Sequence, residues 1–170
     1  GFTSLDIRNV RPSEVGNAGT ATVKIVGDDF GPDSEVQLVG PGGATIEADE
    51  YLQDASVLFA TFDLAGQDAD PDAYDAVVTN PGPDSATEYD ALTVVKGGRP
   101  RLKADLLVPG VVRPGRKINV QVEYANTGNV DLTSPLFTLE SKEGTSWRFV
   151  DSPVPGGDAW IDDRSIAFLG

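Results

Sequence analysis

Apolar and polar residues alternate along much of this chain. Ala21, Val23 and Ile25 are apolar, whereas Thr22 and Lys24 between them are polar. A period of two places successive side chains on opposite faces of an extended strand, so that one face is buried and the other meets water. The pattern predicts an all-β protein whose strands bury one face each, as in a β-sandwich.

Seven runs of this kind are expected before residue 98, separated by glycine, proline and aspartate. Seven short strands with turn residues at these intervals are typical of an Ig-like sandwich. No segment has a convincing 3.6-residue period, so helix is expected to be minor. The expected strands are 4–10, 20–26, 35–39, 44–49, 56–63, 74–79 and 89–95, with Tyr74, Ala76 and Val78 facing inward and Phe2, Phe30, Phe59, Phe62 and Tyr74 in the core.

Charge divides the chain into two parts. Residues 1–98 hold 4 Lys and Arg against 18 Asp and Glu, whereas residues 99–170 hold 9 of each sign. The change falls at the Gly- and Pro-containing segment 96–100, which is of the kind that joins domains. We therefore expect two tandem Ig-like modules, an acidic one at 1–97 and a second at 98–170. The second is either short of strands or has a C-terminal stretch that pairs elsewhere. A start at Gly1 without methionine indicates a piece of a longer protein.

The composition excludes several functions. The chain has no histidine and no cysteine, so Ser/His/Asp and Cys/His catalysis and the usual zinc sites have no residues to build them. A net charge of −14 repels phosphate backbones, so nucleic acid is not an expected partner. No apolar run approaches 18 residues, so direct membrane insertion is not expected. We expect a protein that is not an enzyme, although carboxylate-based glycoside hydrolysis is compatible with the composition.

The first module contains three motifs in a fixed order. They are Val10-x-Pro12, Gly19-Thr20-x-Thr22-Val23-x-Ile25-x-Gly27-x-x-Phe30-Gly31 and Tyr74-Asp75-x-x-Val78-Thr79-Asn80-Pro81-Gly82. With these motifs the module resembles the IPT/TIG family of Ig-like domains over about residues 3–96. The resemblance implies an early-set Ig sandwich, found in bacterial surface proteins, polysaccharide-active enzymes, receptor ectodomains and transcription factors. It names a scaffold and no activity.

The second module begins with strand-like runs at 102–108 and 117–126, where Ile118, Val120, Val122 and Tyr124 are expected to face inward. The module also contains the short motifs Ala104-Asp105-Leu106, Pro114-Gly115, Val120-x-Val122 and Asn126-Thr127-Gly128-Asn129. With these motifs it is similar, over residues 102 to about 141, to the CARDB-like domains of bacterial surface proteins.

Acidic residues at alternate positions make a candidate calcium site. Asp68, Asp70 and Asp72 follow one another in a loop, and calcium requires six to eight oxygen ligands that converge on one point. The alternative is a solvated turn, since Ala73 and Thr79 stand where a helical calcium loop has Gly and Glu. Two further acidic clusters are Asp28, Asp29 and Asp33, which we interpret as turn-capping residues, and Asp158, Asp162 and Asp163.

Trp147 and Trp160 both lie in the second module. Exposed and coplanar, they would stack on sugar rings and make a carbohydrate-binding module. Buried, each would anchor a core through its large apolar area. Both interpretations stay open on the sequence alone.

Together these features predict a non-catalytic spacer, stalk or adhesion segment of a large bacterial extracellular or cell-surface protein, with calcium as a candidate stiffening ion. Its expected partners are neighbouring Ig-like modules of the same parent protein, surface glycans or another cell-surface protein. The alternative is a carbohydrate-binding or accessory module of a secreted polysaccharide-active enzyme.

Overall fold

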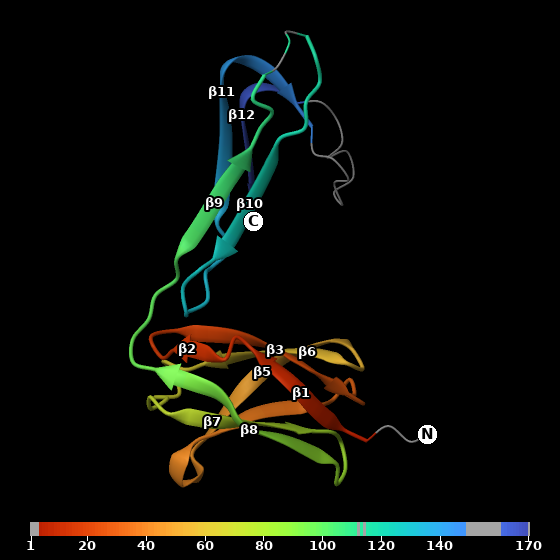
Figure 1. Cartoon of the computed structure of the whole chain (residues 1–170), viewed down its shortest axis with the longest axis vertical. Coiled ribbons are helices and arrows are strands. Elements are labelled where there is room, and N and C mark those ends of the chain that lie inside the picture. The colour runs from red at the N-terminus through yellow and green to blue at the C-terminus, as the bar shows by residue number, and fades with distance from the viewer. Residues whose placement is uncertain (1–3, 112, 114, 149–160, 170) are drawn as a thin grey trace. The chain divides into compact units, whose positions relative to one another are not determined.

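The computed structural model describes residues 4–111, 113, 115–148 and 161–169. It forms two compact units, Gly1–Leu132 and Thr133–Gly170. Apart from one 3-10 turn at Pro41–Gly43, the regular structure of the described residues is entirely strand, which confirms the all-β prediction (Figure 1). The strands are β1 Asp6–Arg11, β2 Glu14–Gly16, β3 Thr20–Asp28, β4 Glu35–Val39, β5 Thr45–Asp54, β6 Val57–Asp63, β7 Ala73–Thr79, β8 Ser85–Val95, β9 Leu102–Leu107, β10 Gln121–Asn126, β11 Leu136–Trp147 and β12 Ile161–Leu169.

Strands β1 to β8 form an Ig-like sandwich in the strand order β1-β3-β6-β5-β4-β7-β8-β2. Strand β5 belongs to both layers: residues 45–47 pair with β4, and residues 48–54 pair with β6. The chain therefore passes from one sheet to the other within a single strand. One layer is β1-β3-β6-β5 and the other is β4-β7-β8-β2 (Figure 1).

The core lies between these layers and follows the alternation of the sequence. In β3, the expected inward residues Ala21, Val23 and Ile25 have at most 2% of their surface exposed. Tyr74, Ala76 and Val78 of β7 are buried as well, as expected. Burial of an apolar side chain of Val or Leu size stabilises a fold by about 1.5–3 kcal/mol, so these two strands contribute a large share of the stability.

Phe59 corrects the predicted core. Phe30, Phe62 and Tyr74 are buried, but Phe59 is only half-buried. In β6 the inward positions are Leu58, Ala60 and Phe62, so the two-residue period places Phe59 on the outer face. There its ring lies beside that of Tyr51, with 6.5 Å between the ring centroids. Phe2 lies outside the described residues.

The short strand β2 is absent from the predicted set. It is three residues long and pairs in parallel with β8, Val15 opposite Val94. Strand β1 pairs with β3 in the other layer, so the chain changes sheets between Arg11 and Glu14. Pro12 has no backbone N–H and cannot continue a strand ladder, which explains why the change occurs there.

Two further hairpins follow the sandwich. In the first unit, β9 and β10 pair antiparallel, with Leu106 opposite Val122. In the second unit, β11 and β12 pair antiparallel, with Phe137 opposite Phe168. Among the described residues, no helix is long and apolar enough to span a membrane.

The predicted inward face of the β10 region is wrong at two positions. Ile118 is 43% exposed and precedes the strand, and Tyr124 is 48% exposed. Val122 is half-buried. A two-stranded ribbon has no second layer of its own, so its alternation alone does not bury a face.

Candidate functional site

The change of sheets at Pro12 leaves backbone groups unpaired at one end of the sandwich. The pairing of β1 with β3 ends at Arg11 opposite Lys24. The first residues of β3, including Thr20 and Thr22, therefore have no β1 neighbour. On the other layer, β2 pairs with β8 on one side and has an open edge at Gly16 on the other. Buried backbone groups need hydrogen-bond partners, so this end requires a further segment.

The segment that supplies those partners is Asn126–Asp131, here called the junction segment. The Gly16 N–H donates to the Asn129 carbonyl at 2.6 Å, and the Asp131 N–H donates to the Thr20 carbonyl at 2.9 Å. One segment thus bonds to β2 of one layer and to β3 of the other.

The carboxylate of Asp131 forms the strongest part of this contact. Its Oδ1 accepts the Thr22 N–H at 3.0 Å, and its Oδ2 lies 2.7 Å from the Thr22 hydroxyl, which donates to it. The hydroxyls of Thr22 and Thr61 are 2.8 Å apart, which extends the network to β6. Hydrogen bonds to a charged acceptor are about twice as strong as neutral ones, so Asp131 holds the junction segment firmly to β3.

Val130 is the apolar part of the same contact. It is 8% exposed, and glycines line the space that it fills. A Cβ at Gly19 would lie 2.7 Å from Cγ1 of Val130, and a Cβ at Gly98 would lie 2.8 Å from its Cγ2. Gly16 meets backbone on two sides, since an added Cβ would overlap the Gly97 carbonyl and approach Gly98. Only chains without side chains at these positions can approach so closely.

The side chain of Asn126 shapes the junction segment from within. Its Nδ2 donates to the Val130 carbonyl at 2.7 Å. Its Oδ1 accepts the N–H groups of Gly128 at 2.9 Å and Arg101 at 3.0 Å. Asparagine commonly closes a turn by bonding the backbone two residues on. The Asn126-Thr127-Gly128 motif therefore forms a turn. This turn directs Asn129, Val130 and Asp131 toward the sandwich.

The outgoing chain is fixed at the same place. The Gly97 N–H donates to Oδ1 of Asn17 at 2.8 Å, and the Ala18 N–H donates to the Gly97 carbonyl at 3.1 Å. The chain leaves the sandwich at Gly97 and returns to it at Asn129, and both crossings are hydrogen-bonded. Gly97, which lies in the segment expected to join the two modules, is thus hydrogen-bonded to the sandwich. The predicted module boundary between residues 97 and 98 stays a prediction.

Asp68, Asp70 and Asp72 are brought into one loop but not onto one point. Among the described residues, no group of three or more Asp, Glu, His or Cys side chains is placed to hold a metal ion. Asp72 accepts the N–H of Ala73 at 2.8 Å, and the Asp70 carbonyl accepts the Tyr74 hydroxyl at 2.9 Å. Burial raises the pKa of Tyr74, and the nearby charge of Asp70 adds to that rise. The geometry is that of a hydrogen-bonded turn, and calcium binding stays a prediction.

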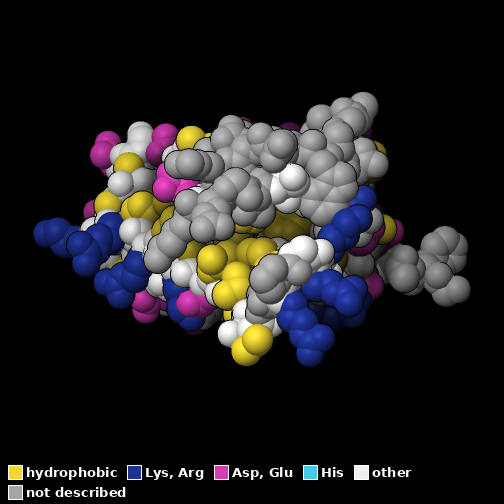
Figure 2. Space-filling view, turned by 90° about the horizontal axis from the view of Figure 1, so that it is seen from above, with side chains coloured by type: hydrophobic (Ala, Val, Ile, Leu, Met, Phe, Trp, Pro, Cys, Tyr) yellow, Lys and Arg dark blue, Asp and Glu magenta, His cyan; other side chains and the backbone are white. Residues whose placement is uncertain are grey.

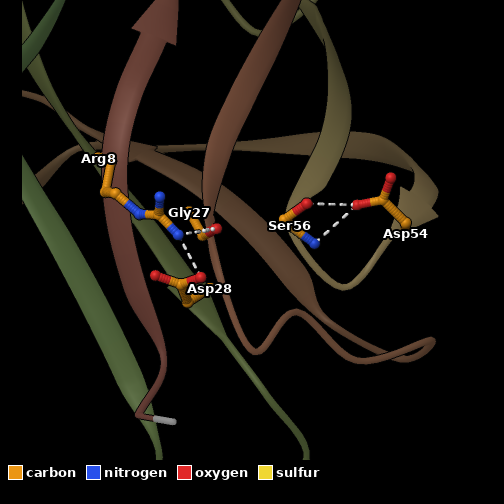
Figure 3. A network of polar contacts seen from close by, with 5 residues as sticks. All are labelled: Arg8, Gly27, Asp28, Asp54 and Ser56. Atoms are coloured by element: carbon orange, nitrogen blue, oxygen red, sulfur yellow. Dashed lines mark hydrogen bonds and ion pairs between the residues drawn. The ribbon is translucent and has the colours of Figure 1, made fainter.

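The second acidic cluster is dispersed in the same way. Asp28 pairs with Arg8, whose guanidinium also donates to the Gly27 carbonyl at 3.0 Å (Figure 3). The turn around Phe30 is closed by other residues, because the Gly31 N–H donates to Ser34 at 2.8 Å. The turn-capping role expected of the aspartates therefore belongs largely to Ser34 here.

A nearby aspartate does close a turn. Asp54 accepts the backbone N–H of Ser56 at 2.8 Å and its hydroxyl at 2.6 Å, between β5 and β6 (Figure 3). The hydrogen bond from the Ser56 side chain is the main reason why the pKa of Asp54 lies below its ordinary value.

Of the two tryptophans, the structure describes Trp147 alone. Trp147 ends β11 and is half-buried. Its indole N–H is buried and has no hydrogen-bond partner among the described residues. Trp160 and Asp158 lie outside the described residues, and for Asp162 and Asp163 only the backbone of β12 is described. Sugar stacking on Trp147 and Trp160 stays a prediction.

Two shallow surface hollows accompany these features. One, of about 350 Å³, is lined by residues of the junction segment and of the stretch 98–101. The other, of about 330 Å³, lies beside the Asp68–Asp70 loop. Neither hollow is lined, among the described residues, by a hydroxyl or thiol nucleophile beside a carboxylate or imidazole base. The lining residues are Gly98, Arg99, Arg101, Thr127, Gly128 and Asn129 in the first, and Asn17, Leu64, Ala65, Asp68, Ala69 and Asp70 in the second.

The strand order and the core define an Ig-like β-sandwich, and hydrogen bonds hold residues 126–131 against one end of it. No protein-family model matches the chain, and no curated protein matches it. The TIG domain of human nuclear factor of activated T-cells, cytoplasmic 4, is similar over 52% of this chain and 88% of its own, with 22% identity and a TM-score of 0.43. A DUF4785 family protein from Legionella pneumophila is similar over 94% of this chain and 45% of its own, with 13% identity and a TM-score of 0.37.

The all-β sandwich is established by the strands β1 to β8. The IPT/TIG resemblance of the motifs stays a prediction. Nothing among these matches bears on the CARDB-like resemblance, which stays a prediction.

Proposed function

We propose that this chain is a non-catalytic structural segment of a bacterial extracellular or cell-surface protein, in which the sandwich holds the β9–β10 hairpin at a fixed angle. A spacer has to resist bending where one folded part passes into the next. The observation that carries the proposal is the double fastening of the junction, with Asn129 bonded to Gly16 and Asp131 bonded to Thr20 and Thr22. An unfastened Gly-Gly link would instead leave the angle free.

The surface charge supports the same role. Residues 1–98 hold 18 acidic and 4 basic side chains, and like charge keeps neighbouring acidic modules apart and soluble. The partners we propose are the neighbouring Ig-like modules of the parent protein.

The test is whether the sandwich and the β9–β10 hairpin tumble as one body. Residual dipolar couplings of the two parts should fit one alignment tensor in the unmodified protein. In Asp131→Ala they should fit two different tensors, since the bonds to Thr22 are lost. Independent tensors in the unmodified protein would remove the proposal. Asp105→Ala, which removes an exposed partner of Lys103, is the control and should keep one tensor.

Calcium stiffening is a separate proposal with its own measurement. Only the spacing of Asp68, Asp70 and Asp72 supports it. A ligand that binds only the folded state raises its melting temperature. An increase at millimolar calcium that is absent in Asp70→Asn would support the site, and an unchanged melting temperature would dismiss it.

A further inference from the structure

The loop end of the β9–β10 hairpin differs in charge from the rest of the first unit. No acidic residue occurs from Leu106 to Val122, and this stretch contains Arg113, Arg116 and Lys117. Residues 99–132 contain six basic and three acidic residues, whereas residues 1–98 contain 4 basic and 18 acidic residues. The chain therefore has an acidic head and a basic hairpin end.

Apolar side chains lie exposed at the same end. Val111 is 89% exposed and Val108 is 53% exposed, and Arg113 and Arg116 beside them are exposed as well. These four residues are here called the hairpin tip. The view in Figure 2 shows hydrophobic side chains reaching the surface with Lys and Arg side chains beside them. Exposed apolar side chains rimmed by charge are a common mark of a protein-binding surface.

A surface of complementary chemistry lies on the sandwich, at the bulge where β7 pairs with β8. Tyr89 is 75% exposed there, and Asp90 beside it is exposed as well. The Asp90 N–H donates to Oδ1 of Asp75 at 2.8 Å, which brings a second carboxylate into the same patch. Among the described residues, no ion pair involves either of these carboxylates. Asp75, Tyr89 and Asp90 are here called the acidic patch.

We propose that the hairpin tip binds the acidic patch of a second copy of this chain. Guanidinium groups bind carboxylates through paired hydrogen bonds and stack on the face of tyrosine, so Arg113 and Arg116 match the acidic patch in both respects. Val108 and Val111 supply the apolar contact area beside Tyr89.

The charge distribution favours this orientation over others. Two acidic heads repel each other, which opposes head-to-head contact, whereas a basic tip is attracted to a head. Charges more distant than about 8 Å are screened at physiological salt, so the groups at the contact decide the outcome rather than the net charge of −14. Because the two surfaces differ, the contact is head-to-tail and leaves a free tip and a free patch at the ends of each assembly.

The inference goes beyond the spacer proposal and does not depend on it, because the dipolar-coupling test concerns one chain and this contact concerns two. A tip of this size buries less area than a stable dimer needs, so the contact is weak and must be measured at high protein concentration.

Sedimentation velocity of the full chain tests the proposal. The average mass should rise with protein concentration in low salt and return to that of a monomer in high salt. Arg113→Glu with Arg116→Glu should remain monomeric, and so should Asp75→Lys with Asp90→Lys. An equimolar mixture of these two double variants should associate again, because the acidic tip of one variant is attracted to the basic patch of the other. Tyr89→Ala should weaken association about tenfold.

Matched variants make the result specific. Arg99→Glu with Arg101→Glu changes the same number of arginines elsewhere in the basic region, and Tyr51→Ala removes another exposed tyrosine, which is 67% exposed; both should associate like the unmodified chain. A monomer at every concentration in low salt would overturn the proposal. Association that survives both charge reversals would do the same, as would binding of the tip to anionic phospholipid vesicles without self-association.

Discussion

Asp131 accepts two hydrogen bonds from Thr22, a residue 109 positions earlier in the chain, one from its backbone N–H and one from its hydroxyl. The bonded end of β3 has no β1 partner, since the β1–β3 pairing ends at Arg11 and Lys24. A carboxylate from beyond the predicted module boundary thus completes an edge that the sandwich leaves open.

Removing the carboxylate should destabilise the sandwich. Asp131→Ala leaves the Thr22 N–H without its partner, and the loss of bonds to a charged group should lower the free energy of unfolding by about 2 kcal/mol. Urea denaturation, monitored by the far-UV circular dichroism of the backbone, measures the change in the free energy of unfolding. Asp105→Ala, at an exposed ion pair, should shift it by less than about 0.5 kcal/mol. Equal effects of the two substitutions would contradict a special role for Asp131.

The space around Val130 should be tested by a double-mutant cycle. A Cβ at Gly19 would lie 2.7 Å from Cγ1 of Val130, so Gly19→Ala should destabilise the protein by about 1–3 kcal/mol through overpacking. Val130→Ala removes Cγ1, the atom that the added Cβ would overlap. The double variant should therefore be more stable than the sum of the single effects predicts, by about 1 kcal/mol. Gly110→Ala, with no atom within 4 Å of the added Cβ, is the control, and strict additivity would contradict the contact.

Truncation tests whether the first module ends at residue 97. A chain of residues 1–97 keeps β1 to β8 but loses buried Val130 and the bonds of Asn129 and Asp131. Its free energy of unfolding should be about 3 kcal/mol below that of a chain of residues 1–132. Chemical denaturation of both chains gives the difference. Equal stability would mean that the sandwich is independent of the junction segment and that the module does end at residue 97.

Tyr74 should make the sandwich sensitive to alkaline pH. Burial raises the pKa of its hydroxyl above the ordinary value of 10.0, so the unfolded chain loses this proton at a lower pH than the folded one. The resulting stability is fully present below pH 10.0 and is lost as the pH rises toward the higher folded pKa. Tyr74→Phe should remove this alkaline loss and, through the missing bond to the Asp70 carbonyl, cost about 1 kcal/mol at pH 7.

Denaturation midpoints between pH 7 and pH 11 provide the measurement for Tyr74. Tyr89→Phe, at a tyrosine that is 75% exposed, should leave the alkaline profile of the unmodified protein unchanged. A Tyr74→Phe profile identical to that of the unmodified protein would show that another group causes the alkaline loss.

The sequence predicted most of the strands because their alternation is local. Strand β4 occurs at the residues expected, and β3, β6 and β7 differ by two residues or fewer at either end. Phe59 was assigned to the core although Leu58 and Ala60 already occupy the inward positions of β6. Strict application of the two-residue period would have placed it outside, beside Tyr51. The three residues of β2 were too few to produce a recognisable period.

For this protein the sequence by itself determined the all-β class of fold, the inward faces of β3 and β7 and the lack of histidine and cysteine side chains. These follow from periodicity and composition, which depend only on near neighbours in the chain. The junction was decided by tertiary structure alone, because Thr22 and Asp131 lie 109 residues apart and nothing in either neighbourhood indicates the other. Pairing at such a separation depends on where β1 leaves the sheet, and that is a property of the folded sandwich.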